Sequence, residues 1–181
     1  MNLPNKLTLL RIILVPVFIT FLLMRGNYPL HAEILALFTF VIAAITDKLD
    51  GYFARKNEIV TKLGKIMDPL ADKLLISGAF IVFVALDEIS VWPAIIIIGR
   101  ELAITGLRVL AASEGVVVPA NKWGKWKTTL QITAIIAVIM DPRIISFPWQ
   151  LPLILIWLAV LITIYSGYIY FKQSNIDFSS E

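Results

Sequence analysis

The chain has 181 residues, of which 59% are hydrophobic, and its formal net charge is +3. Soluble domains contain roughly 45–50% apolar residues, so a chain with a mean hydropathy of +0.84 has too little polar surface to cover a water-soluble globule. The absence of cysteine excludes a disulfide framework and a thiolate metal site. The composition therefore predicts an integral membrane protein.

Six apolar stretches are long enough to cross a membrane, because a hydrocarbon core ~30 Å thick needs about 20 residues of helix. They cover residues 7–24, 30–55, 64–86, 92–112, 122–140 and 150–171. The connections between them carry turn residues, and none is long enough to hold a soluble domain. We therefore expect an all-α integral membrane fold with six transmembrane helices, forming a single membrane domain over residues 1–181.

The first apolar stretch is preceded by residues 2–8, which are polar enough to lie along the membrane interface as a short N-terminal segment. No small-residue cleavage site follows Met24, so the stretch is expected to be a retained helix rather than a signal peptide.

Basic residues set the expected orientation, since Lys and Arg gather on the cytoplasmic side of membrane proteins. With both termini in the cytoplasm, only Arg25 and Arg143 fall outside, whereas Lys48, Lys73 and Arg100 lie within the spans. The cytoplasmic side then holds Lys6, Arg11, Arg55, Lys56, Lys62, Lys65, Arg108, Lys122, Lys125, Lys127 and Lys172.

Four aspartates lie inside the second and third predicted spans, where an acidic side chain costs at least ~2.5–3.5 kcal/mol and therefore suggests function. Asp47 and Asp50 are three residues apart, and Asp68 and Asp72 are four apart, so each pair shares one helix face. The pairs are equidistant from a turn near residue 59, which places all four carboxylates at similar depth near the cytoplasmic surface. They are expected to form one site.

Clustered carboxylates raise one another's pKa unless cations compensate them. Structural ion pairs with Lys48 and Lys73 are one alternative; two divalent cations explain the symmetry of the cluster better. All-oxygen ligands favour Mg²⁺ or Mn²⁺, and His31, near the opposite membrane face, is expected to be an interfacial residue rather than a zinc ligand.

Small and basic residues surround the aspartates. Gly51 and Ala54 continue the face of the first pair, where they either leave room for a substrate or serve helix packing. Arg55, Lys62 and Lys65 border the turn, as phosphate ligands or as topology markers.

A second cationic group comprises Arg108, Lys125 and Lys127, while Arg100 and Glu101 lie midway along the fourth span. An anionic acceptor would need such cations; the alternatives are pairing of Arg100 with Glu101 and positive-inside marking by the rest. Because Lys125 and Lys127 are two apart on a helix, only one of them is expected to face a site.

The region around the aspartates resembles the signature of the CDP-alcohol phosphotransferases, D-x-x-D-G-x-x-A-R-x₈-G-x-x-x-D-x-x-x-D. Every fixed position and the spacer match, through Asp47, Asp50, Gly51, Ala54, Arg55, Gly64, Asp68 and Asp72. The six-helix count agrees with that family, so the resemblance covers nearly the whole chain.

The resemblance implies a Mg²⁺- or Mn²⁺-dependent enzyme of the cell membrane with two metals held by Asp47, Asp50, Asp68 and Asp72. Asp72 would also act as the general base. The implied binding residues for the donor, CDP-diacylglycerol, are Asn5, Thr8, Arg11, Gly51, Ala54, Arg55, Thr61 and Gly64. A homodimer is also implied.

Shorter matching pieces favour sn-glycerol 3-phosphate as the acceptor, with phosphatidylglycerophosphate and CMP as the products of phospholipid biosynthesis. These pieces are residues 5–8 with Arg11, residues 99–102 and residues 124–128. The acceptor phosphate would then be bound by Arg100, Arg108, Lys125 and Lys127.

Two alternatives remain open at this point. Another acceptor of the same family chemistry would be serine, an inositol phosphate or a second lipid. A metal-ion transporter is more remote, because Arg55, Lys62 and Lys65 would repel a cation and no inverted repeat is present.

Overall fold

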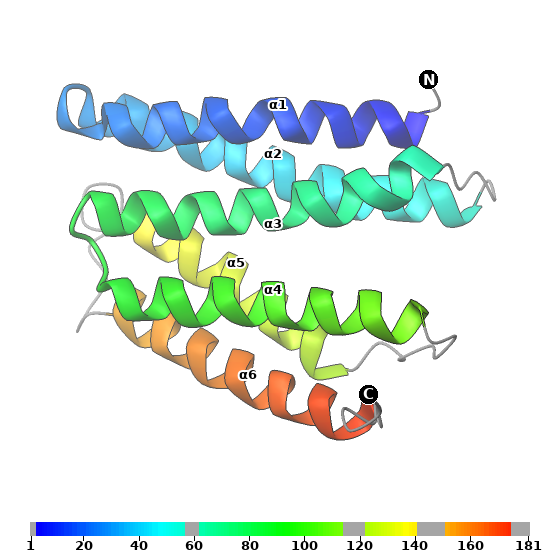
Figure 1. Cartoon of the computed structure of the whole chain (residues 1–181). Helices are drawn as coiled ribbons and strands as arrows, with labels where there is room; N and C mark the ends of the chain where they lie inside the picture. Colours follow the sequence, from blue (N-terminus) through cyan, green and yellow to red (C-terminus); the bar gives the residue numbers. More distant parts are fainter. Residues whose placement is uncertain (1–2, 57–61, 114–121, 141–150, 175–181) are drawn as a thin grey trace.

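The computed structural model describes residues 3–56, 62–113, 122–140 and 151–174, without the side chains of residues 3–4, 47–56, 62–66, 68–69, 112–113, 122 and 173–174. The described residues form six α-helices and one short 3₁₀ turn (Figure 1). In chain order these are α1 (Leu3–Leu23), η1 (Met24–Gly26), α2 (Pro29–Lys56), α3 (Lys62–Ala85), α4 (Val91–Ser113), α5 (Lys122–Met140) and α6 (Leu151–Ser174).

Each predicted span coincides with one helix, and the ends agree within a few residues. Within the described ranges, three helical segments are long and apolar enough to cross a membrane, namely Asn5–Gly26, Pro29–Thr46 and Leu151–Lys172. Residues 3–8 are the first turns of α1, and Thr8 is buried, so the expected N-terminal segment is continuous with the first helix. Its position along the membrane interface stays a prediction.

The helices lie side by side as a bundle in which α1 packs on α2 and α3, α4 on α3 and α6, and α5 on α6 (Figure 1). Fully buried aromatic rings, Phe18, Phe40, Phe80 and Phe83, fill the centre. Large apolar side chains such as Phe38, Val109 and Trp126 are mostly exposed on the outside. Such a surface suits lipid rather than water.

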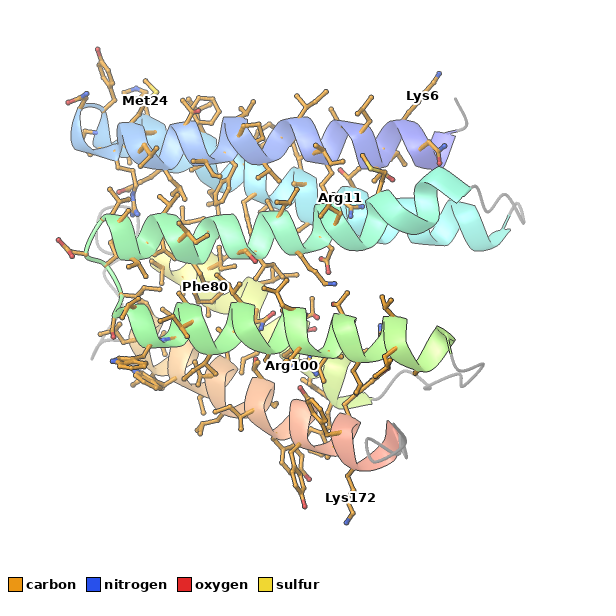
Figure 2. The ribbon with its side chains drawn as sticks, in the orientation of Figure 1. Lys6, Arg11, Met24, Phe80, Arg100 and Lys172 are labelled. Atoms are coloured by element: carbon orange, nitrogen blue, oxygen red, sulfur yellow. The ribbon has the colours of Figure 1, made fainter. Side chains whose placement is uncertain are left out.

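Lys6 and Lys172 lie at the same end of the bundle, while Met24 lies at the opposite end (Figure 2). Figure 1 shows that α2 ends and α3 begins at the end of Lys6 and Lys172 as well. We call this the termini end. The motif aspartates therefore belong to the half of the bundle nearer the termini end, and the turns after α1 and α3 belong to the other half.

A buried ion cluster ties the opposite end of the bundle together. Arg25 is only 3% exposed; its Nε donates to Glu33 Oε1 at 3.2 Å and its Nη1 to Glu88 Oε1 at 2.5 Å. Its Nη2 also donates to the Ile139 carbonyl oxygen at the end of α5, at 3.2 Å. Asp87, with φ 56°, turns the chain after α3 so that Glu88 reaches the arginine. One guanidinium thus joins four parts of the chain.

Replacing Arg25 tests this cluster. Removing one partner of a buried ion pair leaves an uncompensated charge, so Arg25→Met should lower the free energy of unfolding by about 3–5 kcal/mol. Thermal unfolding of the detergent-purified protein measures the change. Tyr28→Ala, an exposed neighbour, is the control; equal unfolding midpoints for the two variants would contradict the assignment.

Candidate active site

The aspartate motif spans the end of α2 and the first half of α3. Asp47 and Asp50 occupy the last turns of α2, and Asp68 and Asp72 follow within α3, so the helical backbone keeps each pair on one face. The side chains of Asp47, Asp50 and Asp68 lie outside the described residues. Asp72 is described, and it is half-buried at the wall of a cavity.

This cavity has a volume of ≈ 640 Å³ and is bounded by α3, α4, α5 and α6. Among the described residues that line it, two are acidic, Asp72 and Glu101. The basic residues that line it are Lys73, Arg100, Arg108, Lys125 and Lys127. The excess of basic over acidic groups favours an anionic ligand within reach of Asp72. We call this the cationic cavity.

The structure thus brings together the four residues that the sequence assigned to an acceptor phosphate, and it places them beside Asp72. Arg100 and Arg108 come from α4, and Lys125 and Lys127 from the first turns of α5. Both lysines line the cavity, and the expectation that only one of them faces the acceptor stays a prediction. Lys127 is buried, whereas Lys125 is exposed at the rim, and the two therefore approach the same space from different depths.

Glu101 organises the buried part of the cationic cavity. Its Oε1 accepts from Lys127 Nζ and, at 3.3 Å, from Arg100 Nη1. The predicted pairing of Arg100 with Glu101 is therefore confirmed, and Lys127 is a further partner that the spacing along one helix could not reveal. The side chains of Lys127 and Glu101 are 8% and 17% exposed, so this contact is shielded from solvent.

Three cavity contacts come from residues to which the sequence assigned no role in the acceptor site. Arg100 Nη2 donates to Ser166 Oγ at 3.0 Å, and Arg108 Nε donates to the Tyr170 hydroxyl at 2.6 Å. Lys73 donates to the Thr105 hydroxyl. The α6 residues were missed because a serine and a tyrosine in an apolar span carry no charge signal, and only the packing of α6 on α4 brings them to the arginines.

The implied donor-site residues are described only in part. Thr8 and Arg11, on the first turns of α1, are 2% and 0% exposed, and Asn5 is half-buried. Figure 2 shows Arg11 on the side of α1 that faces α3. Thr61 lies outside the described residues, and only the helical backbone is described for Gly51, Ala54, Arg55 and Gly64.

The motif aspartates offer oxygen donors only, which is the ligand chemistry that Mg²⁺ and Mn²⁺ prefer. The backbone of α2 and α3 places both pairs in the half of the bundle nearer the termini end (Figure 1). Among the residues whose side chains are described, no group of three His, Asp or Glu could hold a metal ion. Of the four motif aspartates, Asp72 is the one whose side chain is described.

Comparison with known proteins identifies the class. A model of the CDP-alcohol phosphatidyltransferase family matches residues 1–165. The chain therefore belongs to the CDP-alcohol phosphatidyltransferase family.

The relatives narrow the comparison within that family. A Bacillus subtilis (strain 168) protein named CDP-diacylglycerol--glycerol-3-phosphate 3-phosphatidyltransferase is 42% identical, over 96% of this chain and 95% of the relative. A Rickettsia typhi protein of the same name is 40% identical, over 98% and 99%. A Mycobacterium tuberculosis (strain H37Rv) protein named probable phosphatidylglycerophosphate synthase is 37% identical, over 97% and 83%.

Proposed function

We propose that this protein transfers the phosphatidyl group of CDP-diacylglycerol to sn-glycerol 3-phosphate and releases CMP. The observation that carries the proposal is the cationic cavity, which places Arg108 and Lys127 beside Asp72. The names of the Bacillus subtilis and Rickettsia typhi relatives support both the donor and the acceptor.

The acceptor phosphate is a near-dianion, and carboxylates alone would repel it. Arg100, Arg108, Lys125 and Lys127 supply the compensating charge, and guanidinium groups bind phosphate through paired hydrogen bonds. With the phosphate held there, one of the two free hydroxyls of the acceptor is directed toward Asp72. Asp72 takes the hydroxyl proton while the acceptor oxygen bonds to the phosphorus next to diacylglycerol, and the bond from that phosphorus to CMP breaks.

Asp47, Asp50, Asp68 and Asp72 would hold two divalent cations. When bound, such a pair stabilises negative charge on the attacking and leaving oxygens of a phosphoryl displacement. The donor nucleotide would be bound by Asn5, Thr8, Arg11, Gly51, Ala54, Arg55, Thr61 and Gly64, as the family resemblance implies.

The proposal includes a single membrane domain with six transmembrane helices, the termini end in the cytoplasm and a homodimeric state. Cytoplasmic placement would let the nucleotide of the donor reach water-soluble partners while its acyl chains stay in lipid. The positive-inside distribution of Lys and Arg supports this orientation, and the family resemblance supports the dimer.

An acceptor panel tests the proposed reaction. The purified protein in detergent, supplied with CDP-diacylglycerol and Mg²⁺, should release CMP with sn-glycerol 3-phosphate and far more slowly with serine or free inositol. Replacing a phosphate acceptor by an uncharged one removes charge-assisted hydrogen bonds worth about 1.5–3 kcal/mol each. Equal turnover with serine would contradict the acceptor assignment, and preference for an inositol phosphate would assign the chemistry to that acceptor instead.

A further prediction concerns the divalent cations. CMP release should stop in EDTA and return with Mg²⁺ or Mn²⁺, and Asp68→Asn should lower kcat by orders of magnitude because a binuclear site loses a ligand. Asp87→Asn, an exposed aspartate in the turn after α3, is the matched control and should keep full activity. Near-normal turnover of Asp68→Asn would rule out the binuclear site.

Another prediction concerns the orientation of the chain in the membrane. The chain has no cysteine, so single substitutions can be labelled without background. An impermeant thiol reagent added to intact cells should label Ser90→Cys, in the turn before α4, and should label Lys172→Cys only after permeabilisation. The reverse pattern would invert the proposed topology.

A further inference from the structure

One face of α6 contacts both arginines of the cationic cavity. Ser166, Gly167 and Tyr170 lie within four residues of one another, at a spacing that places them on one side of a helix. Their partners, Arg100 and Arg108, are eight residues apart on α4. Arg100 donates to Ser166 and lies next to the position that a Cβ atom on Gly167 would take, and Arg108 donates to Tyr170.

Two features of α6 hold Arg100 in place, namely the hydroxyl of Ser166 and the absence of a side chain at Gly167. Ser166 Oγ accepts from Arg100 Nη2 at 3.0 Å and itself donates to the Thr163 carbonyl oxygen at 3.0 Å, which orients its lone pairs toward the arginine. A Cβ atom on Gly167 would lie 3.3 Å from Arg100 Cγ and 3.5 Å from Arg100 Nε. Because 3.3 Å is tighter than an ordinary contact of a Cβ atom, the absence of a side chain at Gly167 gives Arg100, labelled in Figure 2, the space that it occupies.

The buried phenol group of Tyr170 holds Arg108 in place. Tyr170 is 3% exposed, its hydroxyl accepts from Arg108 Nε at 2.6 Å, and its ring centroid is 5.0 Å from Arg108 Cζ. The hydrogen bond uses Nε, and no described residue accepts from the two terminal nitrogens of Arg108. Those two nitrogens form the side of the guanidinium that binds a phosphate in a bidentate manner.

Fixing these side chains before the ligand arrives has a physical consequence. An arginine side chain without such contacts loses rotamer entropy when it binds an anion. An arginine that hydrogen bonds already hold in one rotamer has lost this entropy before the anion binds. The orientation of a guanidinium group decides whether two of its N–H groups can meet two phosphate oxygens. The contacts that fix this orientation therefore also favour phosphate over an uncharged group.

We propose that Ser166, Gly167 and Tyr170 are positioning residues, which orient Arg100 and Arg108 and thereby make the cavity selective for a phosphate-bearing acceptor. This inference rests on the proposed function of the cavity as the acceptor site. None of the three residues touches the reacting atoms in this account; each acts through an arginine.

Tyr170→Phe is the sharpest variant, because it removes the phenolic oxygen and keeps the ring. It should raise the KM for sn-glycerol 3-phosphate roughly 3- to 10-fold, as expected for loss of one hydrogen bond that orients a charged group. kcat and the KM for CDP-diacylglycerol should stay within about 2-fold. Tyr168→Phe, on the same helix but 64% exposed, should change neither KM.

A double-mutant cycle separates positioning from general loosening of the fold. In an Arg108→Ala background, Tyr170→Phe should add little to the KM for sn-glycerol 3-phosphate, because its partner is already gone. Gly167→Ala provides a second variant; alanine favours helix, and its Cβ would lie 3.3 Å from Arg100 Cγ, so that Arg100 has to shift by a few tenths of an ångström. The variant should therefore raise the same KM without lowering the unfolding midpoint. Additive effects of Tyr170→Phe and Arg108→Ala would overturn the inference.

A second readout does not need turnover. Inorganic phosphate should raise the thermal unfolding midpoint of the wild type more than chloride does at equal ionic strength, and this gain should be smaller for Tyr170→Phe than for Tyr168→Phe. Equal gains in the two variants would overturn the positioning role. Wild type that is protected by phosphate but does not use sn-glycerol 3-phosphate would instead overturn the proposed function.

Discussion

Burying a charged side chain inside an apolar helical bundle is costly unless an opposite charge or hydrogen bonds compensate it. This constraint accounts for two polar centres in the described part of the bundle. At one end, Arg25 is enclosed by Glu33 and Glu88 and by carbonyl groups at the end of α5. Nearer the termini end, Lys127 and Arg100 share Glu101. Ion pairs at these two centres join the helices, and apolar side chains pack between the two centres.

The two centres differ in charge balance, and the difference separates structure from function. Two carboxylates face Arg25, so the positive charge of the arginine is fully compensated within that cluster. The cationic cavity has more basic than acidic groups among its described residues, and it is large enough for a small anion. An excess of positive charge beside an aspartate motif suits a reaction in which a phosphate-bearing acceptor must approach carboxylates. Family membership and the cavity therefore support the same chemistry from independent observations.

Much of the fold could be predicted from the sequence, because apolar length sets helix number and turn residues set the boundaries. The sequence also grouped Arg100, Arg108, Lys125 and Lys127, since charges within apolar spans are conspicuous. The same reasoning read Arg25 only as a topology marker outside the membrane, although it is the centre of a buried cluster. Its partners come from α2, the turn after α3 and the end of α5, and no local pattern connects those segments.

The α6 contacts show a second limit of sequence reasoning. Tyr170 stands in an apolar run where exposed neighbours such as Tyr168 and Phe171 are equally aromatic. Only the packing of α6 against α4 distinguishes the tyrosine that holds an arginine from those on the outer surface. Prediction therefore reached the residues that carry charge and missed the neutral residues that orient them.

The most direct test is an experimental structure of the protein with sn-glycerol 3-phosphate and a divalent cation. The account predicts the phosphate in the cationic cavity, with its oxygens about 3 Å from nitrogens of Arg108 and Lys127, and a free hydroxyl directed toward Asp72. A phosphate bound instead beside Arg55 and Lys65, with the cationic cavity empty, would contradict it.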